Sequence, residues 1–535
     1  MANPGMLYVT MQPKPGLPIE QFHEWYNNEH GPTRLRLPQI FSNGLRYRAA
    51  DEKKPEFLAV YDVTSMSLLE TKTYTALREN RSAHEAKTIG QVDVERYFWD
   101  LVSTKQSPLF IPIEQLTDDE AEGIVLLTIE LKLKDTADAE DETVKWLGEH
   151  VDMLSKVPGW FRSRILKTSS LEAGAPVSLI ALHEFAKENE LGDVARTATA
   201  STPRWGEVQE KYATLSSQRS YSLFYVFGPA PRDLYHLSRL GSSPSSFHPA
   251  GSTDPSAAIT FSITTPDGLS IPYRLEGNPD PKAPTIAFCN SLLTSLHMWD
   301  RVVDILKAQR PQYRILRYDF RGRHAIPEPP APSTMDVLAD DLSALLAALR
   351  IPALDALVGV SMGGATTLKF ALKHPRKLRR FVACDFNAAS SAANTSAWKG
   401  RIGVAETPLD DGTPGMRKLA GLTVERWFHP STLRNKPDVV RWTSDMIASN
   451  DVEGFRYGCQ ALWDYDMKSE MRDCRVPGLL VVGEGDGKGA LVKAMDGFKD
   501  LLGKDGAKLA VVPEAGHLPM CENPEGFWKA VEGFL

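Results

Sequence analysis

Cysteine is scarce in this chain, and its five cysteines all lie in the second half. Their number is odd, and no two of them are spaced as Cys-x-x-Cys. A disulfide framework is therefore not expected, and none of the thiols has the spacing of a metal ligand. The pattern favours reduced thiols in a cytosolic protein.

Long apolar runs and a strong charge of one sign are also absent. No apolar run approaches the length that spans a bilayer, and residues 1–5 lack the basic-then-apolar pattern of a secretory signal. The net charge of −7 over 535 residues gives no reason to expect nucleic acid or an anionic membrane as partner. We expect a cytoplasmic protein that acts on a small molecule, either as a monomer or as a homo-oligomer.

A stretch rich in glycine, proline and serine divides the chain at residues 229–257. Such a composition cannot bury enough apolar surface to fold, so it predicts a linker. A shorter break near residues 104–115 divides the part before it. At this length two or three domains are expected, and we predict them at 1–105, 120–228 and 258–535.

The first two segments show the same order of elements. Each is predicted as strand–helix–strand–strand–helix–strand, the split unit of ferredoxin-like α+β folds. The first helix of each segment ends in Glu-His, at residues 29–30 and 149–150. Two such sheets packed face to face would bury the side of each that its own helices leave bare.

The run Phe-His-Glu-Trp-Tyr-Asn-Asn-Glu-His at residues 22–30 resembles the EthD-like branch of the dimeric α/β barrel superfamily. The resemblance implies that the family's dimer is built here from tandem repeats in one chain, and members include small cyclase-, oxygenase- and dehydratase-like proteins. His30 and His150 are then candidates for acid–base groups of a second site. Alternatively, each Glu-His pair ends a helix, where a cation near the last carbonyls is favoured.

The second half is organised around Gly-x-Ser-x-Gly at residues 359–363, between a short apolar run and a helix-like run. This pattern predicts a strand, a sharp turn and a helix, with Ser361 exposed at the apex as a nucleophile. Gly359 and Gly363 remove side chains that would collide with the strained turn. The surrounding strands alternate with helices, which indicates an α/β fold with a mostly parallel sheet.

A serine nucleophile needs a base and a group that orients the base, and in this fold class the chain order is Ser, acid, His. Asp486 follows a predicted strand at 477–483, and His517 follows the next one at 508–513. Since the carboxyl ends of parallel strands lie on one edge of the sheet, we predict the triad Ser361, Asp486 and His517. Glu484 is the competing acid.

The oxyanion of the intermediate needs backbone donors. One is the N–H of Met362, and the other is expected from residues 290–294, with Leu292 favoured and Ser291 next. Between residues 387 and 475 a long helical insertion carries many aromatic side chains, including Trp398 and Trp463. It predicts a lid above an apolar pocket.

Five motifs carry a second resemblance: Asn-Ser-Leu at 290–292, Arg-Tyr-Asp-x-Arg-Gly at 317–322, Asn-Ala-Ala at 387–389, Trp-x-x-Arg-Ile at 398–402 and Glu-Gly-Phe at 453–455. With them, residues 259–535 resemble α/β-hydrolases and are similar to the 3-oxoadipate enol-lactonases. The resemblance implies the triad named above, no cofactor, and attack on a lactone or enol ester that carries a carboxylate, with Arg321 and Arg401 as anion contacts and Trp398 and Trp463 in the pocket. Two departures stand out. Residues 321–324 read Arg-Gly-Arg-His where the family reads Arg-Gly-His-Gly, and Leu293 replaces an expected glycine.

The sequence thus predicts a serine hydrolase of lactonase or esterase type that works through an acyl-enzyme. Two alternatives stay open. The same triad can hydrolyse a C–C bond next to a ketone, as in retro-Claisen chemistry, because that reaction also passes through an oxyanion. The protein can also be a binding or tailoring protein whose main activity lies in the N-terminal barrel.

Overall fold

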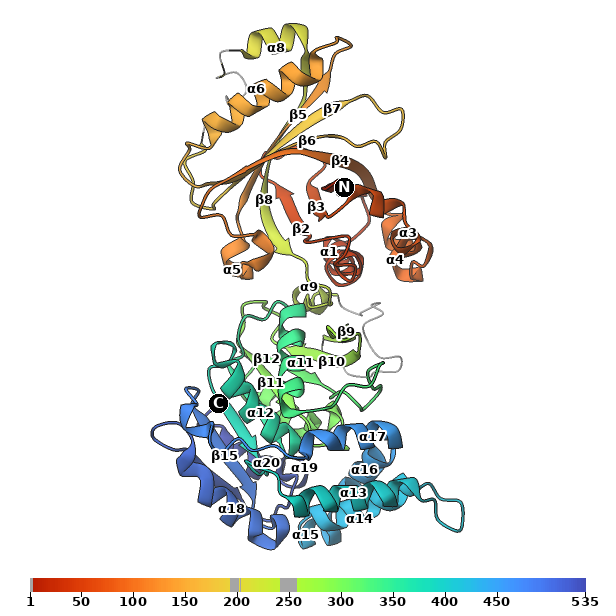
Figure 1. The fold of residues 1–535 in the computed structure, drawn as a ribbon, viewed down its shortest axis with the longest axis vertical. Helices are drawn as coiled ribbons and strands as arrows, with labels where there is room; N and C mark the ends of the chain where they lie inside the picture. The colour runs from red at the N-terminus through yellow and green to blue at the C-terminus, as the bar shows by residue number, and fades with distance from the viewer. Residues whose placement is uncertain (1–2, 193–201, 203, 241–256) are drawn as a thin grey trace. The chain divides into compact units, whose positions relative to one another are not determined.

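The computed structural model describes residues 3–535 except 193–201, 203 and 241–256 (Figure 1). The chain forms two compact units, residues 1–246 and 247–535, and each is described by itself. Among the described residues, no helix combines the length and the apolar composition that crossing a membrane requires.

The N-terminal unit is a closed barrel of eight antiparallel strands in the order β1-β3-β2-β8-β5-β7-β6-β4. In each half of this unit the first strand lies between the third and the fourth, and the second pairs with the third. The halves join where β2 pairs with β8 and β4 pairs with β6. The strands are β1 (Gly5–Pro13), β2 (Leu45–Ala49), β3 (Phe57–Val63), β4 (Val92–Gln106), β5 (Val125–Leu133), β6 (Trp160–Thr168), β7 (Ser178–Phe185) and β8 (Ala213–Val226).

Strand alternation divides the core of this unit into three apolar clusters. Along β1, Leu7 and Val9 belong to a cluster that includes side chains from the helices of the first half. Met6 and Tyr8 belong to a second cluster, which is formed by side chains from strands of both halves. A third cluster packs β5–β8 against the helices of the second half. The shared cluster therefore fills the barrel interior. The helices are α1 (Ile19–Trp25), η1 (Tyr26–His30), α2 (Gly31–Leu35), η2 (Met66–Glu70), α3 (Lys72–Glu79), α4 (Ala83–Ile89), η3 (Ile113–Gln115), α5 (Asp118–Ala121), α6 (Ala139–Leu154), α8 (Trp205–Lys211) and α9 (Leu234–Ser238).

The idea that each Glu-His pair ends a helix is wrong. His30 closes the π-helical segment η1, which runs directly into α2, and α6 continues past His150 to Leu154. Both histidines are buried, and the helical backbone continues beyond each of them. Neither side chain therefore lies at a terminal turn, where the helix dipole would favour a cation.

The expected linker is folded in part. Helix α9 lies within residues 229–257, and its Leu234 and Leu237 are buried. The preceding Asp233 caps α9 and accepts a hydrogen bond from the Asn27 side chain at 2.5 Å. Two apolar side chains and a polar anchor are thus enough to order a segment whose composition favours a linker. Residues 241–256, the rest of the predicted linker, lie outside the described residues.

The C-terminal unit is built on an eight-stranded sheet in the order β16-β15-β14-β13-β11-β12-β10-β9. The strands from β11 to β16 pair in parallel and β9 and β10 form an antiparallel hairpin at one edge, so the mostly parallel sheet is confirmed. Every residue of β13 is buried, as a central strand requires. The strands are β9 (Ala258–Thr264), β10 (Ser270–Gly277), β11 (Thr285–Cys289), β12 (Arg314–Tyr318), β13 (Ala356–Val360), β14 (Phe381–Cys384), β15 (Gly478–Gly483) and β16 (Lys508–Val512).

Helices follow the strands and pack on the sheet, with α12 on β13 and β14, and α18 on β15 and β16. Those outside the insertion are η4 (Leu296–Trp299), α10 (Asp300–Gln309), α11 (Met335–Ala348), α12 (Met362–Lys373), η5 (Pro375–Lys377), η8 (Asp486–Gly489), α18 (Ala490–Phe498), η9 (Lys499–Leu501), α19 (Pro519–Glu522) and α20 (Pro524–Val531).

The long insertion between β14 and β15 is helical, as expected. Its helices pack on one another, with α14 between α13 and α16, and Figure 1 shows them gathered beside the sheet. They are α13 (Ala392–Glu406), α14 (Gly415–Trp427), α15 (Pro430–Asn435), α16 (Pro437–Ala448), α17 (Val452–Cys459), η6 (Gln460–Leu462) and η7 (Met471–Asp473).

Candidate active site

Ser361 lies on a strained turn between β13 and α12. Its backbone has φ 59° and ψ −119°, a conformation that non-glycine residues adopt at a cost of about 1–3 kcal/mol. A Cβ atom at Gly359 would lie 2.2 Å from the carbonyl oxygen of Gly363, and one at Gly363 would lie 2.2 Å from that of Cys289. The two glycines therefore let the turn close tightly enough to present Ser361 at the end of its strand.

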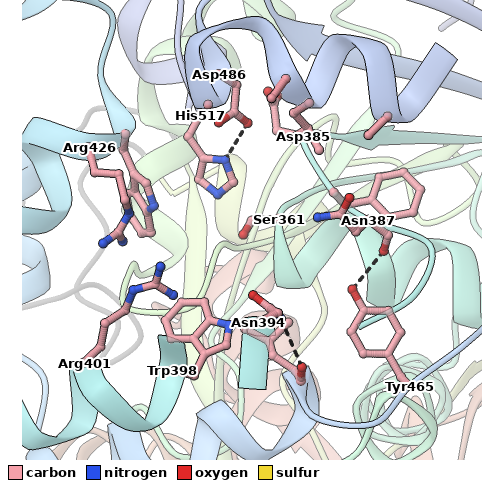
Figure 2. A pocket seen from close by; sticks show the side chains of 17 residues that line it. Ser361, Asp385, Asn387, Asn394, Trp398, Arg401, Arg426, Tyr465, Asp486 and His517 are labelled. Atoms are coloured by element: carbon pink, nitrogen blue, oxygen red, sulfur yellow. Dashed lines mark hydrogen bonds and ion pairs between the residues drawn. The ribbon is translucent and has the colours of Figure 1, made fainter. Parts of the chain in front are cut away.

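His517 and Asp486 meet beside Ser361. Asp486 begins η8 just after β15, His517 follows β16, and Nδ1 of His517 lies 2.7 Å from Oδ2 of Asp486. The backbone N–H of His517 donates to the carbonyl oxygen of Trp427 at 2.7 Å. Figure 2 shows the imidazole between Asp486 and Ser361, and all three side chains line one cavity.

The electrostatics of this pair favour a charged acid. Burial works against ionisation of Asp486, but the charge and hydrogen bond of His517 hold the pKa of that carboxyl below its usual value. The competing acid, Glu484, is exposed and its carboxylate accepts a hydrogen bond from the backbone N–H of Glu514 at 3.2 Å. Of the two predicted acids, the structure brings Asp486 to the histidine.

Asp385 is a further acid at this site that the sequence analysis did not single out. It follows β14 with φ 47°, is 1% exposed, and its Oδ1 accepts the N–H of Gly483 at 2.8 Å. Ligand atoms of Asp385, Asp486 and His517 all lie within 4.8 Å of one another. Burial and the neighbouring charge of Asp486 raise the pKa of Asp385 well above its usual value. The directions of the two shifts favour a protonated Asp385 beside an ionised Asp486.

The predicted oxyanion donors lie at the starts of α12 and of the loop after β11. Met362 is the first residue of α12, so its N–H has no acceptor within the helix. Within the described part of the chain the N–H of Leu292 also has no acceptor. Leu293 has φ 72°, which explains why glycine is expected there and shows that this chain accepts strain instead. Ser291 is buried and its hydroxyl donates to the carbonyl oxygen of Leu292 at 3.3 Å.

The cavity at Ser361 measures about 390 Å³. Trp398 and Arg401, both predicted as substrate contacts, line it. The insertion and the segment after β14 add four polar residues that sequence reasoning missed, and these are Arg426, Asn387, Asn394 and Tyr465.

Two cations give this cavity its charge. Figure 2 shows the guanidinium groups of Arg401 and Arg426 on the same side of the pocket, and neither forms an ion pair with a described residue. Arg401 lies over the Trp398 ring at 4.3 Å. Burial lowers the pKa of Arg426 to about 10, helped by the charge of Arg401, so both remain cations at neutral pH. The guanidinium groups of Arg401 and Arg426 can therefore bind an anionic group of a ligand in this cavity.

Two other predicted contacts lie elsewhere. Arg321 is almost fully buried and its guanidinium binds the carboxylates of Asp341 and Asp267 as well as the hydroxyl of Tyr457. Trp463 lines a second cavity. Neither residue lines the cavity at Ser361, so as substrate contacts they remain predictions without geometric support.

The two candidate histidines of the barrel lie in separate clusters of side chains. Nδ1 of His30 lies 2.7 Å from Oε1 of Glu85, and burial lowers the pKa of His30 to about 3. His150 is fully buried, with its ring 5.4 Å from Trp146 and 5.1 Å from His183. The geometry does not bring His30 and His150 together, and an acid–base role for them stays a prediction.

Comparison with known proteins places the C-terminal half among hydrolases. A family model of the alpha/beta hydrolase fold matches residues 284–524. The 3-oxoadipate enol-lactonase 2 of Acinetobacter baylyi is 28% identical over 271 residues, which cover 51% of this chain and 95% of that protein. The polyketide synthase ThaQ of Burkholderia thailandensis is 25% identical over 293 residues, 53% of this chain but 13% of the synthase. The solved structure of the enol-lactonase from Burkholderia xenovorans LB400 is 28% identical, covers 51% of this chain and 99% of its own, and has a TM-score of 0.45.

Proposed function

We propose that this chain cleaves a lactone, enol-lactone or ester bearing a carboxylate. The chain is a hydrolase whose C-terminal half has the α/β-hydrolase fold and is related to enol-lactonases. The observation that carries the proposal is a single cavity lined by Ser361, by the hydrogen-bonded pair His517 and Asp486, and by two arginines. Nucleophile, base and anion contacts thus face the same space.

In the proposed reaction His517 accepts the proton of Ser361 as the serine oxygen attacks the ester carbonyl carbon. The backbone N–H groups of Met362 and Leu292 donate to the resulting oxyanion. When the intermediate collapses, His517 protonates the departing alkoxide or enolate, which leaves an acyl group on Ser361. His517 then takes a proton from water as the water oxygen attacks the acyl carbon, and it returns that proton to the serine oxygen as the acid is released. Asp486 holds the imidazole with Nδ1 protonated throughout.

The substrate class follows from the lining of the cavity. A volume of about 390 Å³ is at the small end for a ligand pocket. The guanidinium groups of Arg401 and Arg426 would bind a carboxylate of the substrate, since neither is neutralised by a described acid. The side-chain amides of Asn387 and Asn394 supply further polar contacts in the same lining.

We also propose that the N-terminal barrel is a tandem EthD-like dimeric α/β barrel contained in one chain. The repeated strand order of its two halves and the apolar cluster fed by both halves support this assignment. In this proposal the barrel is a separate domain of the same chain and carries none of the groups named in the reaction above.

Active-site labelling tests the hydrolase proposal. We expect a small fluorophosphonate to add one mass equivalent to the full-length protein and none to Ser361→Ala. Ser343→Ala is the matched control, because this serine lies on α11 and binds Lys377 at 2.7 Å, and it should label like the wild type. A folded wild type that does not label, or Ser361→Ala that does, would overturn the serine mechanism.

The arginine contacts are tested with matched esters of the same alcohol, one with a free carboxylate on the acyl part and one without. We expect Arg426→Ala to raise KM for the carboxylated ester by about 10- to 100-fold, the loss of one charge-assisted hydrogen bond, and to change the neutral ester far less. Equal effects on both esters would show that Arg426 does not bind the carboxylate.

A further inference from the structure

A second cavity lies beside the one at Ser361 in the C-terminal unit. It measures about 630 Å³, against about 390 Å³ for the first. Tyr465 is the residue common to the two linings. Tyr465 therefore belongs to the wall between the cavity at Ser361 and the larger one.

The backbone at Tyr465 is firmly held. The residues after β14 and those around 465 run antiparallel, with a bridge between Ala389 and Asp466. The carbonyl oxygen of Tyr465 accepts the N–H of Ser390 at 2.7 Å. The hydroxyl of Tyr465 donates to the carbonyl oxygen of Asn387 at 2.8 Å, and Figure 2 shows this bond at the edge of the catalytic cavity. The partition is thus a side chain anchored at both ends, on a backbone that does not depend on it.

The second cavity is suited to an uncharged ligand. Part of its lining is apolar, from Met335, Ala461 and Met467. The Ser333 hydroxyl, in a side chain only 1% exposed, and Nε1 of Trp463 are buried and have no hydrogen-bond partner among the described residues. Buried donors of this kind are normally satisfied, so they point to an oxygen-bearing guest.

The charged groups of the second cavity disfavour an anion. Its lining carries four acids and one cation, Lys369, which is already paired with Glu470 at 3.1 Å and with Asp336 at 3.5 Å. The remaining acids are Asp464 and Asp466. An anionic group would therefore meet net negative charge here, in contrast to the arginines of the first cavity.

We propose that Tyr465 is a specificity-determining residue: its ring confines the substrate of Ser361 to the smaller cavity and excludes long neutral chains from the larger one. The inference rests on the proposed function, since it concerns the reach of a substrate held at Ser361. Removing the ring would join the two spaces and admit a longer neutral acyl chain, whereas removing the hydroxyl alone would leave the partition in place.

The test is the acyl-chain profile of the full-length protein on p-nitrophenyl esters from acetate to decanoate. We expect Tyr465→Ala to raise the ratio of kcat/KM for octanoate to that for acetate by about tenfold or more, because added methylenes are buried in the opened space. Tyr465→Phe keeps the ring and should keep the wild-type ratio within about twofold. A chain of the same length that ends in a carboxylate should gain less than the neutral chain, because the second cavity is acidic.

The outcomes separate this inference from the proposed function. An unchanged ratio in a Tyr465→Ala protein that still hydrolyses acetate would overturn it, and so would a Tyr465→Phe profile that follows Tyr465→Ala. Absence of acetate hydrolysis and of fluorophosphonate labelling in the wild type would instead overturn the serine mechanism. If Tyr465→Ala does not fold, Tyr465→Leu repeats the comparison with a smaller, ring-free side chain that keeps apolar contacts.

Discussion

The raised pKa of Asp385 beside Asp486 leads to a specific prediction for Asp385→Asn. The asparagine side chain is neutral, as the protonated acid is, and its oxygen can still accept the Gly483 N–H. We therefore expect Asp385→Asn to fold and to keep activity close to the wild type at neutral pH. Asp385→Ala leaves the buried N–H of Gly483 without its acceptor, which should lower the free energy of unfolding by about 1–3 kcal/mol.

The size of the expected effect follows from how the stability of the folded protein depends on pH. The pKa of Asp385 in the folded protein lies above its ordinary value of 3.8. At pH values between the ordinary pKa and the raised pKa, the folded state therefore holds a proton that the unfolded chain releases. The stability of the wild type then falls as pH rises, by up to about 1.4 kcal/mol per pH unit for one proton. Asp385→Asn removes this loss, so its stability relative to the wild type should increase with pH at that slope.

Other groups near the pair leave the comparison intact. Glu522, whose pKa burial raises to about 7, has the same sign of effect, but it is present in both proteins. His517 and Arg426 also act on the charge of Asp486 and are likewise unchanged. The difference between the two proteins therefore isolates Asp385, apart from any small response of Asp486 to its new partner.

The assay must report the C-terminal unit alone. All five cysteines of the chain lie in this unit and are buried, so a pulse of thiol reagent during urea unfolding counts its unfolded fraction and not that of the barrel. Unfolding free energies of both proteins are compared from roughly pH 5 to pH 8. A difference that stays flat over this range would show that Asp385 is ionised in the folded protein and would refute the raised pKa of its carboxyl group.

Further substitutions test the turn, the predicted triad and the second arginine. Gly359→Ala should destabilise the C-terminal unit by about 3 kcal/mol or more in thermal unfolding, because the added Cβ would lie 2.2 Å from a backbone oxygen. The control is Gly148→Ala on α6, where an added Cβ has no atom within 4 Å, and it should stabilise the barrel by about 0.5–1 kcal/mol. Asp486→Asn should lower kcat about 10³-fold or more with little change in KM, because the imidazole loses the partner that fixes its tautomer; a small effect would point to Asp385 as the working acid. Arg401→Ala should impair carboxylated esters as Arg426→Ala does, and a normal KM for the double variant would exclude the carboxylate contact.

That Ser361, Asp486 and His517 line one cavity could be predicted from the sequence, because each of them is marked by local order along the chain. Ser361 is marked by two glycines that the turn requires, and Asp486 and His517 each come just after a strand. Parallel strands bring such positions to one edge without any knowledge of tertiary packing. Asp385 follows β14 in the same way. It could have been predicted from the sequence as an acidic residue at the end of the strand that neighbours β13.

The contacts of the cavity could not be predicted in this way, because they depend on how the insertion packs. Arg426 lies near the end of α14, and no local pattern says that this face of the helix points to Ser361. Arg321 shows the converse. Its motif suggests an anion contact, but its guanidinium group binds the carboxylates of Asp341 and Asp267. Asp267 lies in the β9–β10 hairpin, far from Arg321 along the chain.

The arrangement separates chemistry from selectivity in structural terms. Ser361, Asp385 and Asp486 each follow a parallel strand, so their positions are set by the sheet, and the positive φ angles at Ser361 and Asp385 are sustained by that rigid frame. The arginines and Tyr465 come from the insertion, whose helices pack mainly on one another. Substitutions in the insertion are therefore expected to change the preferred substrate without moving the residues of the predicted triad, and Tyr465, which lines both cavities, is the position where we expect one side chain to change the reach of the site most.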